Sequence, residues 1–441
     1  MIKYLNNNSY RDFEKKLKKI RSHKELKKFY KNFLKNFQYL NLKYKFSINF
    51  DLKYINQQLK NFDYKKKDIF FGIPFGIKDV FNTKYLKTRF GSDLFENYFP
   101  GNNARVVDII EGQQGVTFCK TTTAEFAVHY FPEKKTLNPF DINHITGTSS
   151  SGSAVAVASG ALPCALATQT AGSIIRPASF CGVLGFKPSF GALDRTGVLK
   201  TTDTLDTIGL FASDIYGIEQ VFKNLIQSSN QYPYSKNFFL KKPKKKIKIG
   251  IISDNFIFYK KYDDIVKKNF DNFCNQYLKN FDVKNNFKVD FINDVHENHE
   301  NIYCKSLAYY FSSLRKRKIK MSKIMNRMID QGAKITKNKY LHSLSAQLQQ
   351  TKKFELMMKN YDFLITPSTA SIAPKIGKKE KKDTCLIWTY FGAPSISLPI
   401  FYDQKTGLPF GLQVITSRYN DFALLDFSNK LIKNLSKNKK R

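Results

Sequence analysis

Hydroxyl side chains are concentrated in residues 142–175, a stretch of the chain that contains no Asp, Glu, Lys or Arg. Charged residues make up 25% of the whole sequence, so this gap is conspicuous. Its six serines are Ser149, Ser150, Ser151, Ser153, Ser159 and Ser173. A serine hydroxyl becomes a nucleophile only where a neighbouring group takes its proton. The chemistry open to this stretch therefore depends on the base that the rest of the chain supplies.

Histidine is the commonest base for a catalytic serine, but the histidines fit that role poorly. The chain has six of them: His23, His129, His144, His296, His299 and His342. His129 and His144 lie near the serine run, yet no G-x-S-x-G elbow marks a nucleophile beside them. We interpret the histidines as ordinary polar residues and do not expect a Ser-His-Asp triad.

Lys78 is the lysine best placed to act as a base, because it lies in the apolar segment GIPFGIKDV (72–80). A buried amine must either be paired or lose its charge. Burial lowers an amine pKa from about 10.4 by ~3 units or more, which would make Lys78 a usable base near neutral pH. Two other readings stay open at this point: the side chain reaches solvent from a strand end, or it pairs with Asp79.

Two Gly/Ser-rich turns complete the candidate site. GTSSSGS (147–153) places hydroxyls just before a helix, and TAGS (170–173) places small residues before Ser173. Successive N–H groups in such a turn can converge on one anion, and the absence of charge would keep that site dry. These features indicate acyl transfer. Tight packing or a phosphate-binding loop is the alternative, although no G-x-x-x-x-G-K-[ST] motif is present.

Strands and helices alternate around these segments. We predict a turning strand over 69–82, a helix over 104–115, a buried strand over 116–122, a helix over 151–161, a strand over 162–169 and a helix or turn over 173–180. Residues 10–62 have the apolar spacing of two or three amphipathic helices. The pattern favours an α/β fold with one large core, in which helices cover both faces of a mixed, mostly buried sheet.

The chain divides into four predicted regions. Residues 1–65 form N-terminal helices that pack on the core, and 66–235 form the core with the chemical segments. A polar, Lys-rich stretch at 226–246 indicates a linker or a loop on the surface. We expect 236–355 to be a variable, mostly helical region on the substrate side, and 356–441 to complete the core sheet.

Composition narrows the class of protein. The net charge of +37 invites a nucleic-acid reading, but the excess lies in the N-terminal segment, 241–248, KKEKK (378–382) and the tail. Lys, Asn, Ile, Phe and Tyr all have AT-rich codons, so we attribute the excess to coding bias and expect solvated lysines and no nucleic-acid partner. No stretch is apolar enough to cross a membrane, and we expect no secretory signal. The six scattered cysteines suggest free thiols in the cytoplasm.

Several ordered motifs together resemble the amidase signature family, whose members hydrolyse or transfer carboxamides through a Ser–cis-Ser–Lys triad. GIPFGIKD is similar to its lysine segment, and NPFDINHITGTSSSGSAVAVASG to its Gly/Ser-rich signature. ALATQTAGSIIRPASFCGVLGFKPSFG is similar to its nucleophile segment, and TDTLDTIGLFASD to the stretch that follows. GAPSISLPI and GLPFGLQVI resemble its C-terminal strands, so the likeness covers roughly 65–225 and 355–430.

The resemblance implies a role for each matching residue. Ser173 would be the nucleophile, Ser149 the bridging serine after a cis peptide bond, and Lys78 the base. The oxyanion would sit on the N–H groups of Thr170, Ala171, Gly172 and Ser173. Ser150, Gln169 and Arg176 would support the site; for Arg176 we favour fixing the loop over meeting an acidic substrate. The resemblance implies no cofactor and no metal.

Two departures from the family pattern bear on the branch. Thr148 and Ser151 replace glycines of G-G-S-S-G-G, and Gln169 and Ala171 replace Asp and Gly of D-x-G-G-S. The TQTAGS form is one associated with general amidases, so we predict a stand-alone amidase for a small carboxamide. The alternatives are the A subunit of a tRNA-dependent amidotransferase and an inactive binding protein on the same fold. The amide itself and a homodimeric state stay open.

Overall fold

A computed structural model of the chain describes residues 9–128, 136–227, 247–253, 259–279, 281–284, 290–316 and 321–437. In this part of the chain eleven strands form one sheet. The strands are β1 (Ser47–Asn49), β2 (Pro74–Lys78), β3 (Val116–Thr121), β4 (Cys164–Gln169), β5 (Leu184–Lys187), β6 (Thr207–Ala212), β7 (Lys248–Ile251), β8 (Asp282–Lys284), β9 (Phe363–Pro367), β10 (Ser395–Tyr402) and β11 (Pro409–Ile415).

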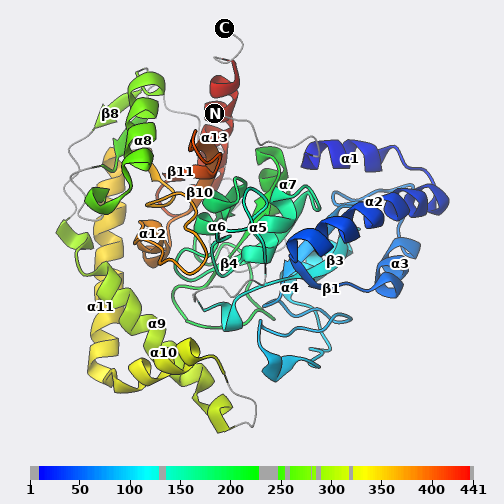
Figure 1. Ribbon diagram of the computed structural model, residues 1–441, viewed down its shortest axis with the longest axis horizontal. Coiled ribbons are helices and arrows are strands. Elements are labelled where there is room, and N and C mark those ends of the chain that lie inside the picture. Colours follow the sequence, from blue (N-terminus) through cyan, green and yellow to red (C-terminus); the bar gives the residue numbers. More distant parts are fainter. Residues whose placement is uncertain are drawn as a thin grey trace.

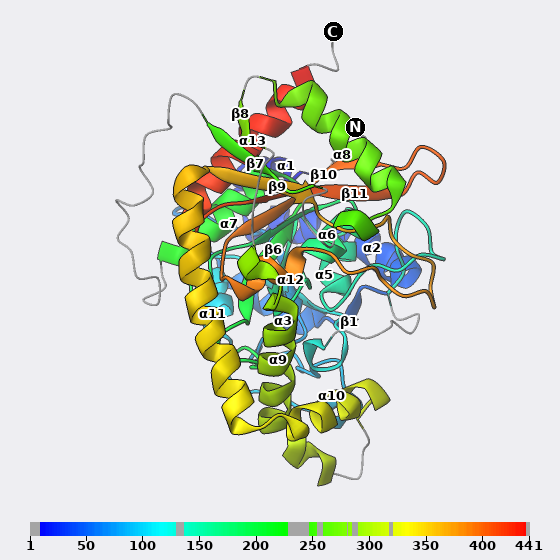
Figure 2. The same ribbon diagram turned by 90° about the vertical axis from the view of Figure 1, so that its left-hand side faces the viewer.

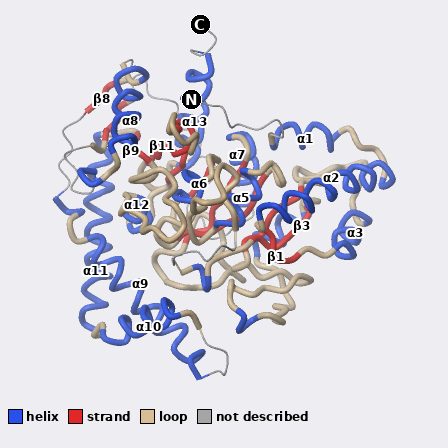
Figure 3. Tube along the Cα trace, in the orientation of Figure 1, coloured by secondary structure: helices blue, strands red, loops and turns tan. Residues whose placement is uncertain are grey.

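Helices surround this sheet, which Figure 3 shows as a layer of strands running through the middle of the molecule. The α-helices of the described ranges are α1 (Tyr10–Lys18), α2 (His23–Tyr44), α3 (Leu52–Lys60), α4 (Arg105–Gly112), α5 (Ser151–Ala158), α6 (Ile175–Phe180), α7 (Ile215–Gln227), α8 (Asp264–Tyr277), α9 (Val295–Phe311), α10 (Lys323–Lys334), α11 (Lys337–Met357), α12 (Cys385–Tyr390) and α13 (Asp421–Lys437). The predicted α/β class and mixed sheet are confirmed.

The sheet has the strand order β1-β3-β2-β4-β6-β5-β10-β11-β9-β7-β8 and mixes parallel with antiparallel pairs. Strand β2 runs parallel to both of its neighbours, β3 and β4. Strand β6 is antiparallel to β4 and β5, and β10 is antiparallel to β5 and β11. Because parallel strands end at the same edge of a sheet, the last residues of β2 and β4 lie close together.

The short helices α5 and α6 lie at the centre of the molecule in Figure 1 and carry the serine-rich segments to the sheet. Helix α5 packs on β2, β3 and β4, and α6 packs on β5, β10 and β11. Gly152 allows the close approach of α5, because a Cβ there would lie 2.3 Å from the backbone nitrogen of Thr122. Helices α7 and α13 pack on the sheet as well, at β5 and β6 and at β10 and β11 respectively.

Two groups of helices lie on opposite sides of this core. Helices α1, α2 and α3 gather on one side and α9, α10 and α11 on the other (Figure 1). Figure 2, turned by 90°, brings the second group to the front, with the long α11 beside α9. Contacts of α9 with α10, α11 and α12 bind this group to the body. Residues 10–62, predicted to form two or three amphipathic helices, form the three helices α1, α2 and α3. The four-region division of the chain stays a prediction.

No helix within the described ranges is both long enough and apolar enough to span a bilayer. The stretch KKPKKKIK (241–248), predicted as surface charge, falls outside the described residues up to 246, as do His129 and the tail after 437.

Candidate active site

Lys78 ends strand β2 and is fully buried, with none of its surface accessible. Its Nζ lies 2.8 Å from Ser149 Oγ, 2.8 Å from Ser150 Oγ and 2.9 Å from Thr168 Oγ1. Desolvation lowers the pKa of Lys78 well below its usual value, and the charge of Asp206 opposes that shift only in part. Both alternative readings of this lysine are therefore wrong, since it neither reaches solvent nor pairs with Asp79.

Asp79 instead forms an ion pair with a second buried lysine, Lys120 of β3. The carboxylate accepts hydrogen bonds from the N–H groups of Arg89 and Gly91, and it lies 3.8 Å from Lys120 Nζ. Sequence reasoning missed this lysine, because VTFCKTT carries no mark of a buried charge apart from its apolar neighbours. The pairing leaves Lys78 with hydroxyl and carbonyl partners only.

Ser149 and Ser150 stand at the start of α5, where the chain turns towards the end of β2. The peptide bond between Thr148 and Ser149 is cis, as the resemblance implied. Ser150 Oγ also donates to the carbonyl of Thr168, at 3.1 Å. Of the other serines in the run, Ser153 bonds Leu166 O and Thr121 Oγ1, and Ser159 bonds Ala156 O. The Ser153 hydroxyl thus ties α5 to β4 and β3, whereas the Ser159 hydroxyl bonds only within the end of α5.

Ser173 lies in the turn between β4 and α6 and is 6% exposed. Within the part of the chain that the structure describes, its Oγ makes no hydrogen bond, and the N–H groups of Ala171, Gly172 and Ser173 have no acceptor. The next two N–H groups, of Ile174 and Ile175, donate to Gln169 Oε1 at 2.7 and 3.0 Å. The turn thus offers donors just before the nucleophile candidate.

Gln169 therefore supports the turn from inside, with a fully buried side chain. Its Nε2 donates to Thr389 Oγ1 at 2.8 Å, and Thr389 Oγ1 donates to the carbonyl of Ala171 at 2.7 Å. Sequence reasoning did not single out Thr389, which lies in the segment WTYFGAPS of α12 and the turn after it.

Arg176 fixes the same turn from the other side. Its guanidinium contacts Asp383 at 2.8 Å and Glu380 at 3.1 Å, and both carboxylates are almost wholly buried. A Cβ on Gly172 would lie 2.8 Å from Arg176 Nη2, so the glycine leaves room for the guanidinium of Arg176 beside the loop. The lysines of KKEKK (378–382) are exposed, as predicted, whereas Glu380 between them turns towards Arg176.

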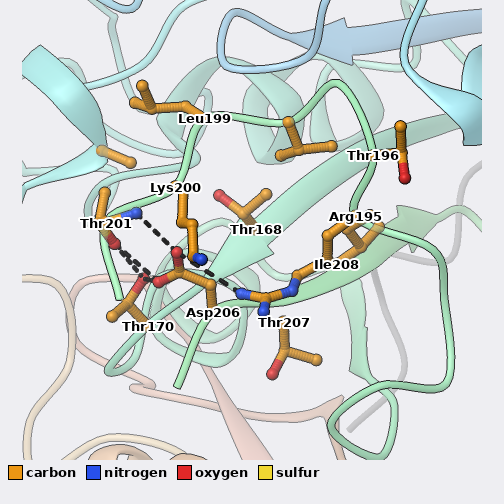
Figure 4. Close-up of a pocket in the computed structure, with 12 residues that line it drawn as sticks. Thr168, Thr170, Arg195, Thr196, Leu199, Lys200, Thr201, Asp206, Thr207 and Ile208 are labelled. Carbon is orange, nitrogen blue, oxygen red and sulfur yellow. Dashed lines mark hydrogen bonds and ion pairs between the residues drawn. The ribbon is translucent and has the colours of Figure 1, made fainter. Parts of the chain in front are cut away.

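A third group, not predicted from the sequence, surrounds Asp206. This carboxylate accepts hydrogen bonds from Thr170 Oγ1 at 2.7 Å and from the N–H groups of Thr201 and Thr202. Figure 4 shows it between Thr170, Thr201 and Arg195, beside a cavity of about 220 Å³. Thr168 and Thr170 line that cavity, so it approaches the Lys78 cluster from the β4 side; Ser149 and Ser173 are not part of its lining.

The geometry thus brings Lys78, Ser149 and Ser150 into contact, and places the nucleophile candidate in the turn that follows a neighbouring strand. The sequence model of the Amidase family matches residues 30–425. The chain belongs to this family. The match includes Lys78, Ser149, Ser150 and Ser173, so the family resemblance is confirmed over most of the chain.

Relatives within the Amidase family differ in what they are described as doing. A curated relative from Persephonella marina, the A subunit of a glutamyl-tRNA(Gln) amidotransferase, is 28% identical across 86% of this chain and 87% of its own. A solved amidase structure is 22% identical, with a TM-score of 0.84 over 97% of this chain and 99% of that one. A 6-aminohexanoate cyclic dimer hydrolase complexed with substrate is 19% identical, with a TM-score of 0.83 over 98% and 97%. The two structures establish the fold.

The described residues contain no group of three or more His, Cys, Asp or Glu side chains suited to a metal ion. All six cysteines are free thiols. The groups that the site itself offers for chemistry are the hydroxyls, the buried amine and the backbone N–H groups described above.

Proposed function

We propose that the protein is an amidase that hydrolyses a small carboxamide to a carboxylic acid and ammonia or an amine, through an acyl-enzyme on Ser173. The observation that carries this proposal is the 2.8 Å contact between Lys78 Nζ and Ser149 Oγ in a fully buried cluster. Burial lowers the pKa of Lys78, and a neutral amine is the form that can accept a proton.

Hydrogen counting supports a direction for the proton relay. Ser150 gives its hydrogen to Thr168 O, so Ser150 Oγ accepts one N–H of Lys78. Thr168 takes the second N–H, at 2.9 Å to Oγ1 and 3.4 Å to the carbonyl. A neutral amine has two N–H donors and one lone pair, which leaves the lone pair for the hydroxyl of Ser149.

The first half of the reaction follows from this arrangement. Ser173 Oγ attacks the amide carbon while its proton passes to Ser149 and the proton of Ser149 passes to Lys78. The carbonyl oxygen becomes an oxyanion, for which the N–H groups of Ala171, Gly172 and Ser173 are available donors. Thr170 N–H is the fourth donor in the proposal. The relay then returns a proton to the leaving nitrogen as the C–N bond breaks.

In the second half water attacks the ester formed on Ser173. Lys78 and Ser149 again accept and return one proton, and the acid leaves with Ser173 restored. The net change is one amide and one water converted to one acid and one amine. Nothing in these steps requires a histidine, a cofactor or a metal.

An amide panel with ammonia and amine detection tests the proposal. Ser173→Ala and Lys78→Ala should each lower turnover by roughly a thousandfold or more. Ser159→Ala is the matched control, since this serine lies in the same run but bonds only the end of α5. Trapped acyl-enzyme should add the acyl mass to Ser173 alone. Full activity in both site variants would refute the mechanism, and a wild-type protein inert to every amide would favour an inactive binding protein.

The A subunit of a tRNA-dependent amidotransferase is the second candidate. The specific observation in its favour is the curated relative of that description from Persephonella marina, which aligns over most of both chains. Purified protein that releases ammonia from simple amides without a partner supports the stand-alone amidase. Activity that appears only with partner subunits and tRNA would support the second candidate.

We place this reaction in the cytoplasm, with a small-molecule amide as the partner. The six free thiols support a reducing compartment. The buried, hydroxyl-lined interior around Lys78 supports a small polar substrate rather than a nucleic acid.

A further inference from the structure

The three carbonyl groups of residues 170–172 all receive hydrogen bonds from the protein side of the turn. His299 Nε2 lies 2.9 Å from Thr170 O, Thr389 Oγ1 lies 2.7 Å from Ala171 O, and Arg176 N lies 3.0 Å from Gly172 O. A peptide unit is planar and trans units point C=O and N–H in opposite directions. A donor that holds one carbonyl therefore also aims the N–H of the next residue away from itself.

This rule links each donor to one N–H of the proposed oxyanion loop. His299 aims Ala171 N–H, Thr389 aims Gly172 N–H, and Arg176 N aims Ser173 N–H. These are the same three N–H groups that have no acceptor in the described part of the chain. Hydrogen bonding to a carbonyl also polarises its peptide unit and strengthens the N–H as a donor. Two side chains and one backbone group thus set the direction of the loop.

His299 reaches the loop from α9, in the region 236–355 that the sequence predicts to be variable and mostly helical. Its side chain is 2% exposed, and desolvation lowers its pKa to about 4, so the ring is neutral at pH 7. A carbonyl only accepts hydrogen bonds, which means that Nε2 carries the ring hydrogen. Helix α9 is held in turn by Asn301, whose Nδ2 donates to Ser343 Oγ of α11 at 3.1 Å.

Thr389 has an equally defined role in the hydrogen-bond chain. Gln169 Oε1 accepts two N–H groups, so its Nε2 is the donor to Thr389. Thr389 must therefore accept from Gln169 and pass its own hydrogen on. Ala171 O, at 2.7 Å, is nearer than Cys385 O, at 3.2 Å. A hydroxyl at position 389 is what joins α12 to the loop.

We propose that His299 and Thr389 are positioning residues that aim the N–H groups of Ala171 and Gly172 at the reacting carbonyl oxygen. The proposal rests on the function proposed above. It assigns to α9 and α12 the task of building the oxyanion site, in addition to covering it. Neither side chain touches the reacting atoms.

Paired variants test this assignment. His299→Phe keeps a ring without the donor, and His299→Gln keeps a donor. Thr389→Val keeps the shape without the hydroxyl, and Thr389→Ser keeps the hydroxyl. Thr416→Val is the matched control, because Thr416 is 2% exposed and its Oγ1 also donates to a backbone carbonyl, Asp362 O at 2.8 Å, in a different part of the molecule.

Three quantities are measured for each variant: steady-state kinetics on a hydrolysed amide, the melting temperature, and the rate at which a fluorophosphonate labels Ser173. His299→Phe and Thr389→Val should lower kcat and the labelling rate by about tenfold to a hundredfold, with KM changed less than about twofold. Thr389→Ser should stay near wild type, His299→Gln should recover part of the loss, and Thr416→Val should change only stability.

The inference is overturned if folded His299→Phe and Thr389→Val keep wild-type kcat and labelling rate. It is also overturned if Thr416→Val loses as much kcat as they do, because the effect would then follow stability. The labelling rate separates this failure from failure of the proposed function. Wild-type protein that neither labels at Ser173 nor hydrolyses an amide refutes both, whereas labelling at equal rates in all variants refutes the positioning role alone.

Discussion

Lys78 and Lys120 lie on the neighbouring parallel strands β2 and β3, and neither has any accessible surface. The register pairs Lys78 with Thr121 and Ile77 with Lys120, so the two amines point to opposite faces of the sheet. Lys78 meets hydroxyls and a carbonyl. Lys120 meets the carbonyl of Phe81, two threonine hydroxyls and the carboxylate of Asp79.

The two amines differ in that only Lys120 has a carboxylate, that of Asp79, beside it. This difference sets their pKa values apart. Burial lowers the pKa of Lys120 to about 8 and raises that of Asp79 to about 6, while each charge opposes the shift of the other. Each group thus favours the charged form of the other, as in a structural ion pair. Lys78 has no carboxylate in hydrogen-bond contact, and burial carries its pKa well below the usual value. Two lysines with the same burial thus suit opposite tasks.

Replacing Lys78 by Met should break the chemistry and spare the fold. We expect kcat to fall by roughly a thousandfold or more, because the base is lost while the apolar stem is kept. Thermal unfolding and ammonia release are measured on the same preparation. A folded Lys78→Met protein with wild-type turnover would contradict the assignment of the base.

Replacing Lys120 by Met should destabilise the fold and spare the chemistry. The change leaves the buried Asp79 carboxylate without its cation, and we expect the free energy of unfolding to fall by about 3 kcal/mol or more. Turnover per folded molecule should stay within about twofold of wild type. The double variant Lys120→Met with Asp79→Asn should recover part of the stability, as contacting groups do. Loss of turnover in a folded Lys120→Met protein would break the comparison.

Lys187, at the end of β5, provides a third buried amine between these extremes. It donates to the carbonyls of Pro188 and Ala393, and burial lowers its pKa to about 7 while Asp421 opposes the shift. Between pH 7 and 10.5 the unfolded chain holds a proton here that the folded chain has released. Stability therefore gains with rising pH, by up to about 1.4 kcal/mol per pH unit relative to Lys187→Met. Denaturant unfolding at pH 7, 8 and 9 measures it; parallel curves for the two proteins would count against this value.

Asp206 tunes Lys78 from a distance, and its removal should give the smallest effect. The neutral amine is the active form, so kcat/KM should rise with pH through the pKa of Lys78. The carboxylate of Asp206 raises that pKa. Asp206→Asn should therefore move the rising limb to lower pH, whatever it does to the height of the profile through Thr170. A limb that stays in place or moves up would show that Asp206 does not act on Lys78.

Local patterns predicted most of the elements that carry the site. The apolar segment ending at Lys78 is β2, the Gly-stopped segment at 104–115 is α4, and the small-residue segment is α5. These succeed because strand and helix periods are written in adjacent residues. The cis peptide bond before Ser149 was implied by the family resemblance and not by any local pattern.

Partners supplied by distant segments could not be predicted. His299 lies in α9, within a stretch that offered no motif, and only the fold brings it to the carbonyl of Thr170, the residue after β4. Glu380 reads as one acid among lysines, yet it lies against Arg176 inside the protein. The sequence alone does not show whether Lys120 is an exposed or a buried strand residue. The structure places it 3.8 Å from Asp79 inside the protein.

The sequence by itself determined which chemical groups are available: Ser149 and Ser173, a lysine in an apolar strand, and a turn of small residues. Their order along the chain also placed the protein in the Amidase family. Only the tertiary structure decided which buried lysine lacks a carboxylate, and which side chains hold the loop carbonyls. The physical reason is that a pKa and a peptide orientation depend on neighbours within a few ångströms, and folding brings those neighbours from β4, α9 and α12.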